Sequence, residues 1–157
     1  MDNWIGPIVG THAAAPGRID PGHAAALARE AGEEWLRMGT PRVNVLVAGR
    51  DEAVQLVLET LFVHIEKPIA NWSPGEPLML PPVGRPGTLV LHDVAALEPG
   101  DQIRLLEWSA RAMGSMQVIS TTSAPLLPRI AAGTFIDTLY YRLNTVYIEL
   151  ERPHDDN

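Results

Sequence analysis

The fold of this chain is indicated most clearly by residues 87–94, which read GTLVLHDV. The run from Thr88 to Leu91 is a continuous apolar and β-branched stretch, which is typical of a strand covered on both faces of a parallel sheet. Two ionisable side chains, His92 and Asp93, follow this run directly. They stand at the carboxyl end of the predicted strand, where ligands of open α/β sheets bind.

Further strand patterns lie on either side of this run. Residues 43–48 are rich in valine and are followed by Gly49, after which apolar residues recur at helical spacing up to Phe62. Other short strands are predicted at 68–72, 116–121 and 145–150, and other helices at 21–38, 99–113, 125–132 and 135–143. Strands that alternate with helices predict an α/β fold, a three-layer structure around a parallel five-stranded sheet.

Two features of the pattern concern details of this fold. In the helix that begins at Pro99, the apolar spacing predicts an inward face made of Ile103, Leu106, Ala110 and Met113. Residues 73–86 are rich in proline and glycine and are therefore expected to form a loop.

Length and composition favour one domain. The chain has 157 residues, of which 46% are hydrophobic, enough for one substantial core. We expect an irregular N-terminal arm over residues 1–20, an α/β domain over 21–151 and a tail over 152–157. The net charge of −7 argues against nucleic acid or an anionic membrane as the main partner. Neither a secretory signal nor a membrane span is visible, so a cytoplasmic location is expected.

Two segments resemble the AAA+ domain of sigma-54 activators, the bacterial enhancer-binding proteins. These are residues 87–94, GTLVLHDV, and residues 133–144, GTFIDTLYYRLN. In that family the corresponding stretches read GGTLFLDEI and G-x-FREDLYYRLN. The resemblance covers roughly residues 43–150 and implies a P-loop NTPase core of the AAA+ type. Fold analogy does not confer the family's activity, which depends on the site residues.

The phosphate-binding loop departs from the family pattern. A P-loop cradles phosphate with backbone N–H groups that its glycines allow to converge, while a lysine neutralises the charge. Residues 49–56 read GRDEAVQL, so that only Gly49 of the G-x-x-x-x-G-K pattern remains. Val54 stands at the second glycine and Gln55 at the lysine. Asp51 and Glu52 place negative charge at a helix N-terminus, which suits the helix dipole and repels phosphate.

The other nucleotide-contacting positions are altered as well. The family's paired acids become His92 and Asp93, and Ser123 stands where the resemblance implies a polar sensor of the γ-phosphate. Asp93 either binds a cation or, as we favour, caps a neighbouring loop. Of two arginines that act on a neighbouring subunit's nucleotide, only Arg142 remains, since Ile136 replaces the first. Arg142 is a candidate arginine finger, or it forms an ion pair with an acid such as Asp137 or Glu107.

Two absences bear on function. The family's long insertion with the GAFTGA loop that grips sigma-54 has no counterpart, because only residues 73–86 connect the second and third strands. The sequence also shows no PPLRER continuation, helical lid or helix-turn-helix after the last strand. We therefore expect an AAA+-like core subdomain without the helical lid and without direct DNA binding.

Several aromatic and apolar residues are candidates for a partner-binding surface, although each tryptophan could equally fill the core. The apolar triplet of the proline-rich loop is the strongest of them, because no strand of the predicted fold requires it. The candidates are Trp4, Trp72, Leu78, Met79 and Leu80.

Together these observations predict a non-catalytic AAA+-like domain that serves as a protein-interaction or regulatory module. We expect no catalytic residues, no cofactor and no metal, since the histidines show no zinc-binding spacing and cysteine is absent. The expected partner is a protein, which includes another AAA+ protein or a second copy of this chain, and not a membrane. The alternative is a nucleotide-binding switch with an altered phosphate loop, whose contacts would come from Gly49, Arg50, Gln55, Asp93, Ser123 and Arg142.

Overall fold

The structure is a computed structural model that describes residues 43–112 and 114–150, together with Ala26 and Glu33. The arm predicted over residues 1–20, the tail over 152–157 and most of the predicted helix 21–38 lie outside the described residues.

Five parallel strands form a single sheet in the order β2-β3-β4-β1-β5. The strands are β1 (Val45–Ala48), β2 (Ile69–Trp72), β3 (Gly87–Leu91), β4 (Met116–Thr122) and β5 (Val146–Glu149). All residues of β1, β3 and β4 are buried, as the continuous apolar run of residues 88–91 predicted for β3. The parallel α/β fold is therefore confirmed, and the carboxyl ends of all five strands meet at one edge of the sheet.

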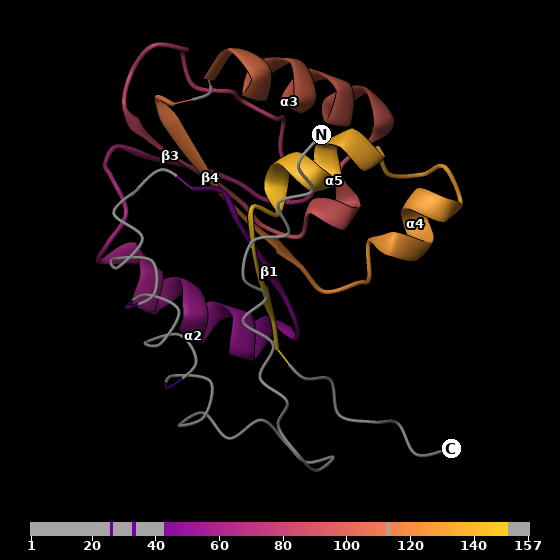
Figure 1. The fold of residues 1–157 in the computed structure, drawn as a ribbon, viewed down its shortest axis with the longest axis horizontal. Coiled ribbons are helices and arrows are strands. Elements are labelled where there is room, and N and C mark those ends of the chain that lie inside the picture. Colours follow the sequence, from indigo (N-terminus) through magenta and orange to yellow (C-terminus); the bar gives the residue numbers. More distant parts are fainter. Residues whose placement is uncertain (1–25, 27–32, 34–42, 113, 151–157) are drawn as a thin grey trace.

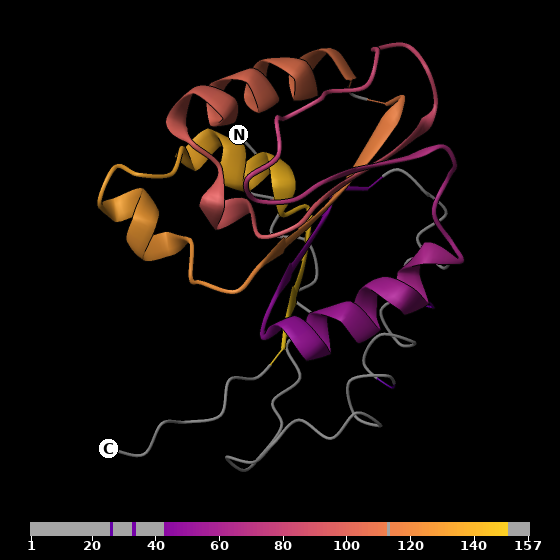
Figure 2. The same cartoon turned by 180° about the vertical axis from the view of Figure 1, so that it is seen from behind.

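Helices cover both faces of this sheet (Figures 1 and 2). Helix α2 (Asp51–Phe62) lies on one face, and α3 (Pro99–Ala112) and α5 (Asp137–Leu143) lie on the other. A short 3-10 helix, η1 (Val94–Ala96), and a five-residue helix, α4 (Leu127–Ala131), connect the strands to these longer helices. The core accordingly divides into two apolar clusters, one under α2 and one under α3 and α5. The predicted three-layer arrangement is confirmed.

The predicted inward face of α3 was wrong by about one residue. Ile103 is 50% exposed and Ala110 is exposed, whereas Leu106 is half-buried and packs against the core; Met113 lies outside the described residues. The buried face of α3 includes two side chains whose hydrogen bonds are made in the interior, and apolar periodicity does not detect such residues. The Gln102 amide bonds to three backbone groups, and the Trp108 indole N–H donates to the Pro81 carbonyl at 2.7 Å. The buried face is Gln102, Leu105, Trp108, Ser109 and Ala112.

The boundaries of the last two helices also differ from the prediction. Helix α4 begins at Leu127 and α5 at Asp137, two residues later than the sequence pattern suggested in each case. Gly133 lies between them with φ of 76°, the left-handed region that favours glycine. This turn ends α4 and lets Phe135 point into the core.

Candidate functional site

The carboxyl edge of the sheet brings together Asp93, from the end of β3, and Ser123, from the end of β4. The Ser123 backbone N–H and hydroxyl both donate to Asp93 Oδ1, each at 3.4 Å. The Asp93 N–H donates to Thr121 Oγ1 at 3.0 Å. Asp93 therefore caps the loop that follows β4, which is the role favoured from the sequence. The backbone φ of Asp93 is 53°, which is unusual for a residue other than glycine. Such conformations are found most often at functional sites.

His92 also has partners within the protein. Its backbone N–H donates to the Trp72 carbonyl at 2.9 Å, which continues the β2–β3 pairing. Its Nε2 lies 3.3 Å from Asn71 Oδ1. Among the described residues, no three metal-ligating side chains are grouped where they could hold an ion.

The turn after β1 is too short to form a phosphate cradle. Only Gly49 and Arg50 separate the end of β1 from the start of α2 at Asp51. The Val54 N–H donates to the Arg50 carbonyl at 2.9 Å, an ordinary first-turn helix bond. Residues 51–54, which correspond to the inner part of a P-loop, are therefore helical. Their backbone is wound into α2 and does not form a loop around an anion.

Gly49 is required by packing in this structure. A Cβ placed on it would lie 2.8 Å from the Leu150 Cβ, closer than carbon atoms approach in proteins. The Gly49 N–H donates to the Thr122 carbonyl at 3.0 Å, and the Leu150 N–H donates to the Ala48 carbonyl at 2.7 Å. The single retained P-loop glycine thus has a structural explanation that needs no ligand.

Arg142 lies away from these residues. It borders a small cavity at the opposite edge of the sheet, beside Asn44 before β1 and Met116 at the start of β4. Its carbonyl accepts a hydrogen bond from Asn44 Nδ2 at 3.0 Å. Within one chain, Arg142 therefore does not join Gly49, Asp93 and Ser123, and the six residues of the nucleotide-switch alternative do not form one site. Arg50 and Gln55 are exposed at the start of α2.

The structure separates the partner-binding candidates into buried and exposed residues. Trp72 is 3% exposed and its indole N–H donates to the Glu76 carbonyl, and Leu78 is 2% exposed. Both are core residues, so their assignment to a partner surface was wrong. Leu80 is half-buried, whereas Met79 is 76% exposed. Trp4 lies outside the described residues.

A surface depression of about 560 Å³ lies between this loop and α3. The Arg104 guanidinium connects its two sides, since it donates to the Leu78 carbonyl at 3.1 Å and pairs with Asp101 at 3.0 Å. Arg111, seven residues or about two turns further along α3, also borders the depression. No motif in the sequence singled out these residues, and the seven-residue spacing of Arg104 and Arg111 is the one signal that could have found them. The lining is Leu80, Pro81, Pro82, Val83, Arg104, Glu107, Trp108 and Arg111.

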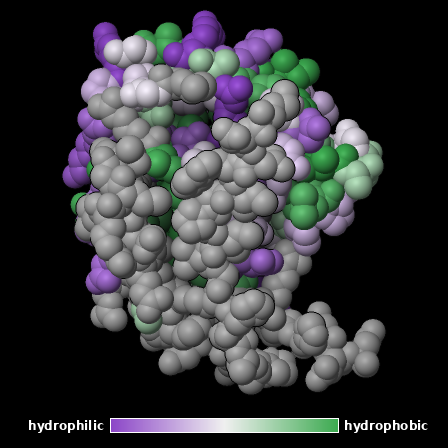
Figure 3. Space-filling view, in the orientation of Figure 1, coloured by the Kyte–Doolittle hydropathy of each residue, from purple (hydrophilic) through white to green (hydrophobic). Residues whose placement is uncertain are grey.

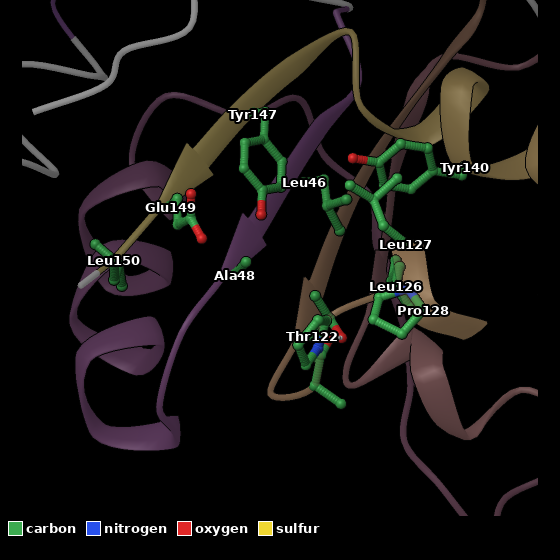
Figure 4. A pocket seen from close by; sticks show the side chains of 12 residues that line it. Leu46, Ala48, Thr122, Leu126, Leu127, Pro128, Tyr140, Tyr147, Glu149 and Leu150 are labelled. Carbon is green, nitrogen blue, oxygen red and sulfur yellow. Dashed lines mark hydrogen bonds between the residues drawn. The ribbon is translucent and has the colours of Figure 1, made fainter. Parts of the chain in front are cut away.

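A second cavity, of about 510 Å³, lies at the carboxyl end of β1 and β5, beneath α4 and α5 (Figure 4). Nothing in the sequence indicated it, because its lining comes from five separate segments. These are Leu46 and Ala48, Thr122, residues 124–128, Tyr140, and Tyr147, Glu149 and Leu150.

The parallel sheet with helices on both faces is a three-layer α/β fold. Similar folds are found in NtrX from Brucella abortus bound to ATP (TM-score 0.62, 18% identity, 82% of this chain and 35% of that chain). A DNA polymerase III gamma subunit-related protein from Thermotoga maritima is also similar (TM-score 0.52, 11% identity, 82% of this chain and 47% of that chain).

Residues 65–152 match the model of the Sigma-54 interaction domain. The chain belongs to this family, as the resemblance of residues 87–94 and 133–144 predicted. It is 39% identical to the transcriptional regulatory protein ZraR of Escherichia coli, over 41% of this chain and 17% of that protein. ZraR of Salmonella typhimurium matches to the same extent. The chain thus spans about a sixth of the length of these relatives, and the matched family region begins after α2.

A helix that spans a membrane must be long and apolar, and the helices of the described residues can be judged on both properties. None of those within residues 43–112 and 114–150 is long and apolar enough to cross a bilayer.

Proposed function

We propose that this domain is a non-catalytic member of its family, an AAA+-like protein-interaction or regulatory module that does not hydrolyse nucleotide and acts in the cytoplasm. Proteins can keep a packed sheet while they lose the chemistry that it once positioned, because packing and catalysis depend on different residues.

The start of α2 directly after Gly49 and Arg50 carries this proposal. A P-loop binds phosphate through several backbone N–H groups that point into one concave loop, assisted by a lysine. Here those positions are helical, and Gln55 replaces the lysine. Asp51 and Glu52 are exposed in the first turn, where phosphate would gain from the helix dipole, so their charge opposes an anion.

The arrangement around Asp93 supports the same proposal. Hydrolysis in such sheets needs one carboxylate to hold the metal ion and another group to orient the attacking water. The metal-side position is His92, whose ring lies beside Asn71, and the Asp93 carboxylate accepts hydrogen bonds from Ser123. The two residues therefore make structural contacts between neighbouring strand ends.

The surface that best fits a protein partner is the depression between residues 80–83 and α3, together with Met79, the neighbouring exposed residue of the loop. Met79 and Val83 are exposed apolar side chains, and Arg104 and Arg111 border the same depression. Apolar side chains beside arginines are typical of interface centres. We propose that this surface receives an acidic, partly apolar segment of another protein, with a second AAA+ domain or a second copy of this chain as the candidates.

Thermal unfolding tests the loss of nucleotide binding. A ligand that binds only the folded state raises the free energy of unfolding, by an amount that grows with the ratio of the ligand concentration to Kd. We expect no change in Tm with magnesium and millimolar ATP, GTP or their diphosphates, and no phosphate release. A family member with an intact G-x-x-x-x-G-K loop serves as the positive control. A reproducible rise of several degrees would instead support the nucleotide-binding switch.

The partner surface is tested by comparing two equally exposed residues. Met79 and Val63 are 76% and 77% exposed, and Val63 caps α2 on the opposite face of the sheet. Sedimentation analysis of the chain, alone and mixed with an activator AAA+ domain, measures the association. Met79→Glu should weaken it and Val63→Glu should not. Equal effects of both variants, or association unaffected by Met79→Glu, would contradict the assignment.

A further inference from the structure

The cavity beneath α4 and α5 has the size and composition of a small-molecule site. Its volume of about 510 Å³ falls within the roughly 300–1,000 Å³ range of ligand pockets. Its base is formed by Leu46 and Ala48 of β1, and Leu126 closes it from the loop before α4. All three are buried. An apolar group that enters this cavity therefore contacts the sheet and α4 at the same time.

Three polar side chains border this apolar base. Tyr147 and Glu149 project from the same face of β5, because they are two residues apart on a strand. Figure 4 shows the Glu149 carboxylate beside Tyr147, with the Tyr140 ring on the far side of Leu46. The hydroxyl of a fourth polar residue, Thr122, donates to the Ala124 carbonyl at 2.7 Å. Among the described residues that line the cavity, Glu149 alone is charged at neutral pH.

We propose that this cavity binds a small organic cation, a molecule with an apolar body and one protonated amine. The Tyr147 ring attracts a cation through its face, and the Glu149 carboxylate adds a charge-assisted hydrogen bond. The ammonium group lies beside the Glu149 carboxylate and the Tyr147 ring, and the apolar body lies on Leu46, Ala48 and Leu126, toward Tyr140. The net charge of −7 adds a long-range attraction for a cationic ligand.

The same features disfavour an anionic ligand. None of the described lining residues is a lysine or arginine, and the Glu149 carboxylate repels phosphate and carboxylate groups. Nucleotides are therefore poor candidates for this cavity even though it lies at the carboxyl edge of the sheet. The inference holds whether or not the domain has lost hydrolysis, because none of its residues belongs to the phosphate loop.

Exposed apolar residues extend this site outward. Leu127, which lines the cavity, is 60% exposed, and Figure 3 shows hydrophobic side chains gathered around α4 on this side of the molecule. A ligand in the cavity contacts α4, α5 and the sheet together, so its binding should stabilise the fold.

Three probes with one apolar body test the proposal: n-hexylammonium, 1-hexanol and hexanoate. Titration of the ¹⁵N-labelled full chain, followed by NMR, measures Kd and locates the site from the amides that shift. We expect hexylammonium to shift amides around Tyr147 and Glu149, with a Kd about tenfold lower than that of hexanol. Hexanoate should bind more weakly than hexanol. The isosteric Glu149→Gln should abolish the preference for the amine.

Glu59→Gln is the matched control, since Glu59 is an exposed carboxylate of α2 on the other face of the sheet. This variant should leave the Kd of each of the three probes unchanged. Tyr147→Leu keeps an apolar lining but removes the ring beside Glu149, and it should weaken hexylammonium more than hexanol. Equal binding of the three probes, shifts confined to another surface, or no shifts at all would overturn the proposal. Displacement of the probes by ATP would assign the cavity to nucleotide instead.

Discussion

Leu150 lies over Gly49 so closely that a Cβ on Gly49 would stand 2.8 Å from the Leu150 Cβ. The contact joins the residue after β5 to the turn after β1, two neighbouring strands of the parallel sheet. Leu150 is buried and packs in the apolar cluster beneath α2 with Ala53 and Val54. The turn that binds phosphate in P-loop proteins is here a packing site for a leucine.

The first prediction concerns Gly49→Ala. The added methyl group must displace Leu150 or the β1 turn, and overpacking of this kind costs about 1–3 kcal/mol. Urea unfolding followed by circular dichroism measures the change. Gly100→Ala is the control, because a Cβ at Gly100 meets nothing within 4 Å and the residue lies in α3. That variant should change stability by at most about 1 kcal/mol, toward greater stability. Equal effects of the two variants would contradict the packing explanation.

Gln102 gives a second prediction. Its Nε2 donates to the carbonyls of Leu97 and Thr134, at 2.9 and 3.0 Å, and its Oε1 accepts from the Ile136 N–H at 3.0 Å. Gln102→Leu keeps the volume but leaves three backbone groups without this partner, at a cost of about 2–4 kcal/mol.

The same substitution at an exposed glutamine provides the control for Gln102. Gln55 is exposed on α2, so Gln55→Leu should change the free energy of unfolding by less than about 0.5 kcal/mol. Chemical denaturation compares the two variants. If Gln102→Leu were as stable as the parent, the amide would not hold α3 to the segment between α4 and α5.

The proline-rich loop allows a test on two adjacent residues. Leu78 is buried, and Met79 beside it is exposed. Leu78→Glu places an unpaired charge in the core and should cost at least about 4 kcal/mol, whereas Met79→Glu should stay within about 0.5 kcal/mol of the parent. Thermal unfolding distinguishes them. Two variants with the same Tm would mean that the loop is not docked on α3 as described.

The acids at the start of α2 give a fourth prediction. Asp51→Asn with Glu52→Gln removes two negative charges from the first turn, each worth about 0.3–1 kcal/mol at low ionic strength. We expect a loss of stability that shrinks in high salt, measured by urea unfolding at two salt concentrations. Glu59→Gln, further along α2, should show no comparable salt-dependent loss. A gain of stability in the double variant would mean that these acids are kept for a reason other than helix stability.

The local features of the sequence were sufficient for the fold class. Continuous apolar runs such as residues 88–91 predicted buried parallel strands, and Pro99 correctly marked the start of α3. The motif of residues 133–144 predicted the family, which the match over residues 65–152 confirms. The role of Asp93 as a cap also followed from its position at a strand end. All of these depend on the identity and order of neighbouring residues.

The errors arose where distant residues decide burial. Trp72 and Leu78 resemble exposed interface residues in sequence, but their burial depends on the loop that folds back on α3. The rotation of α3 depends on partners of Gln102 that lie about 34 positions away. Periodicity reports only the polarity of side chains along one helix, so it misses a polar side chain whose hydrogen bonds are met across the core.

The sequence by itself determined the parallel α/β fold, the family and the absence of a normal G-x-x-x-x-G-K loop, because each is written in contiguous residues. Only the tertiary structure decided that Gly49 packs against Leu150, that Arg142 lies at the opposite edge from Asp93, and that a cavity bordered by Glu149 opens beneath α4. These relationships involve residues of β1, β4, β5 and the last two helices. Strand β1 is far from the other elements along the chain, and the crossover connections of the parallel sheet make them neighbours in space.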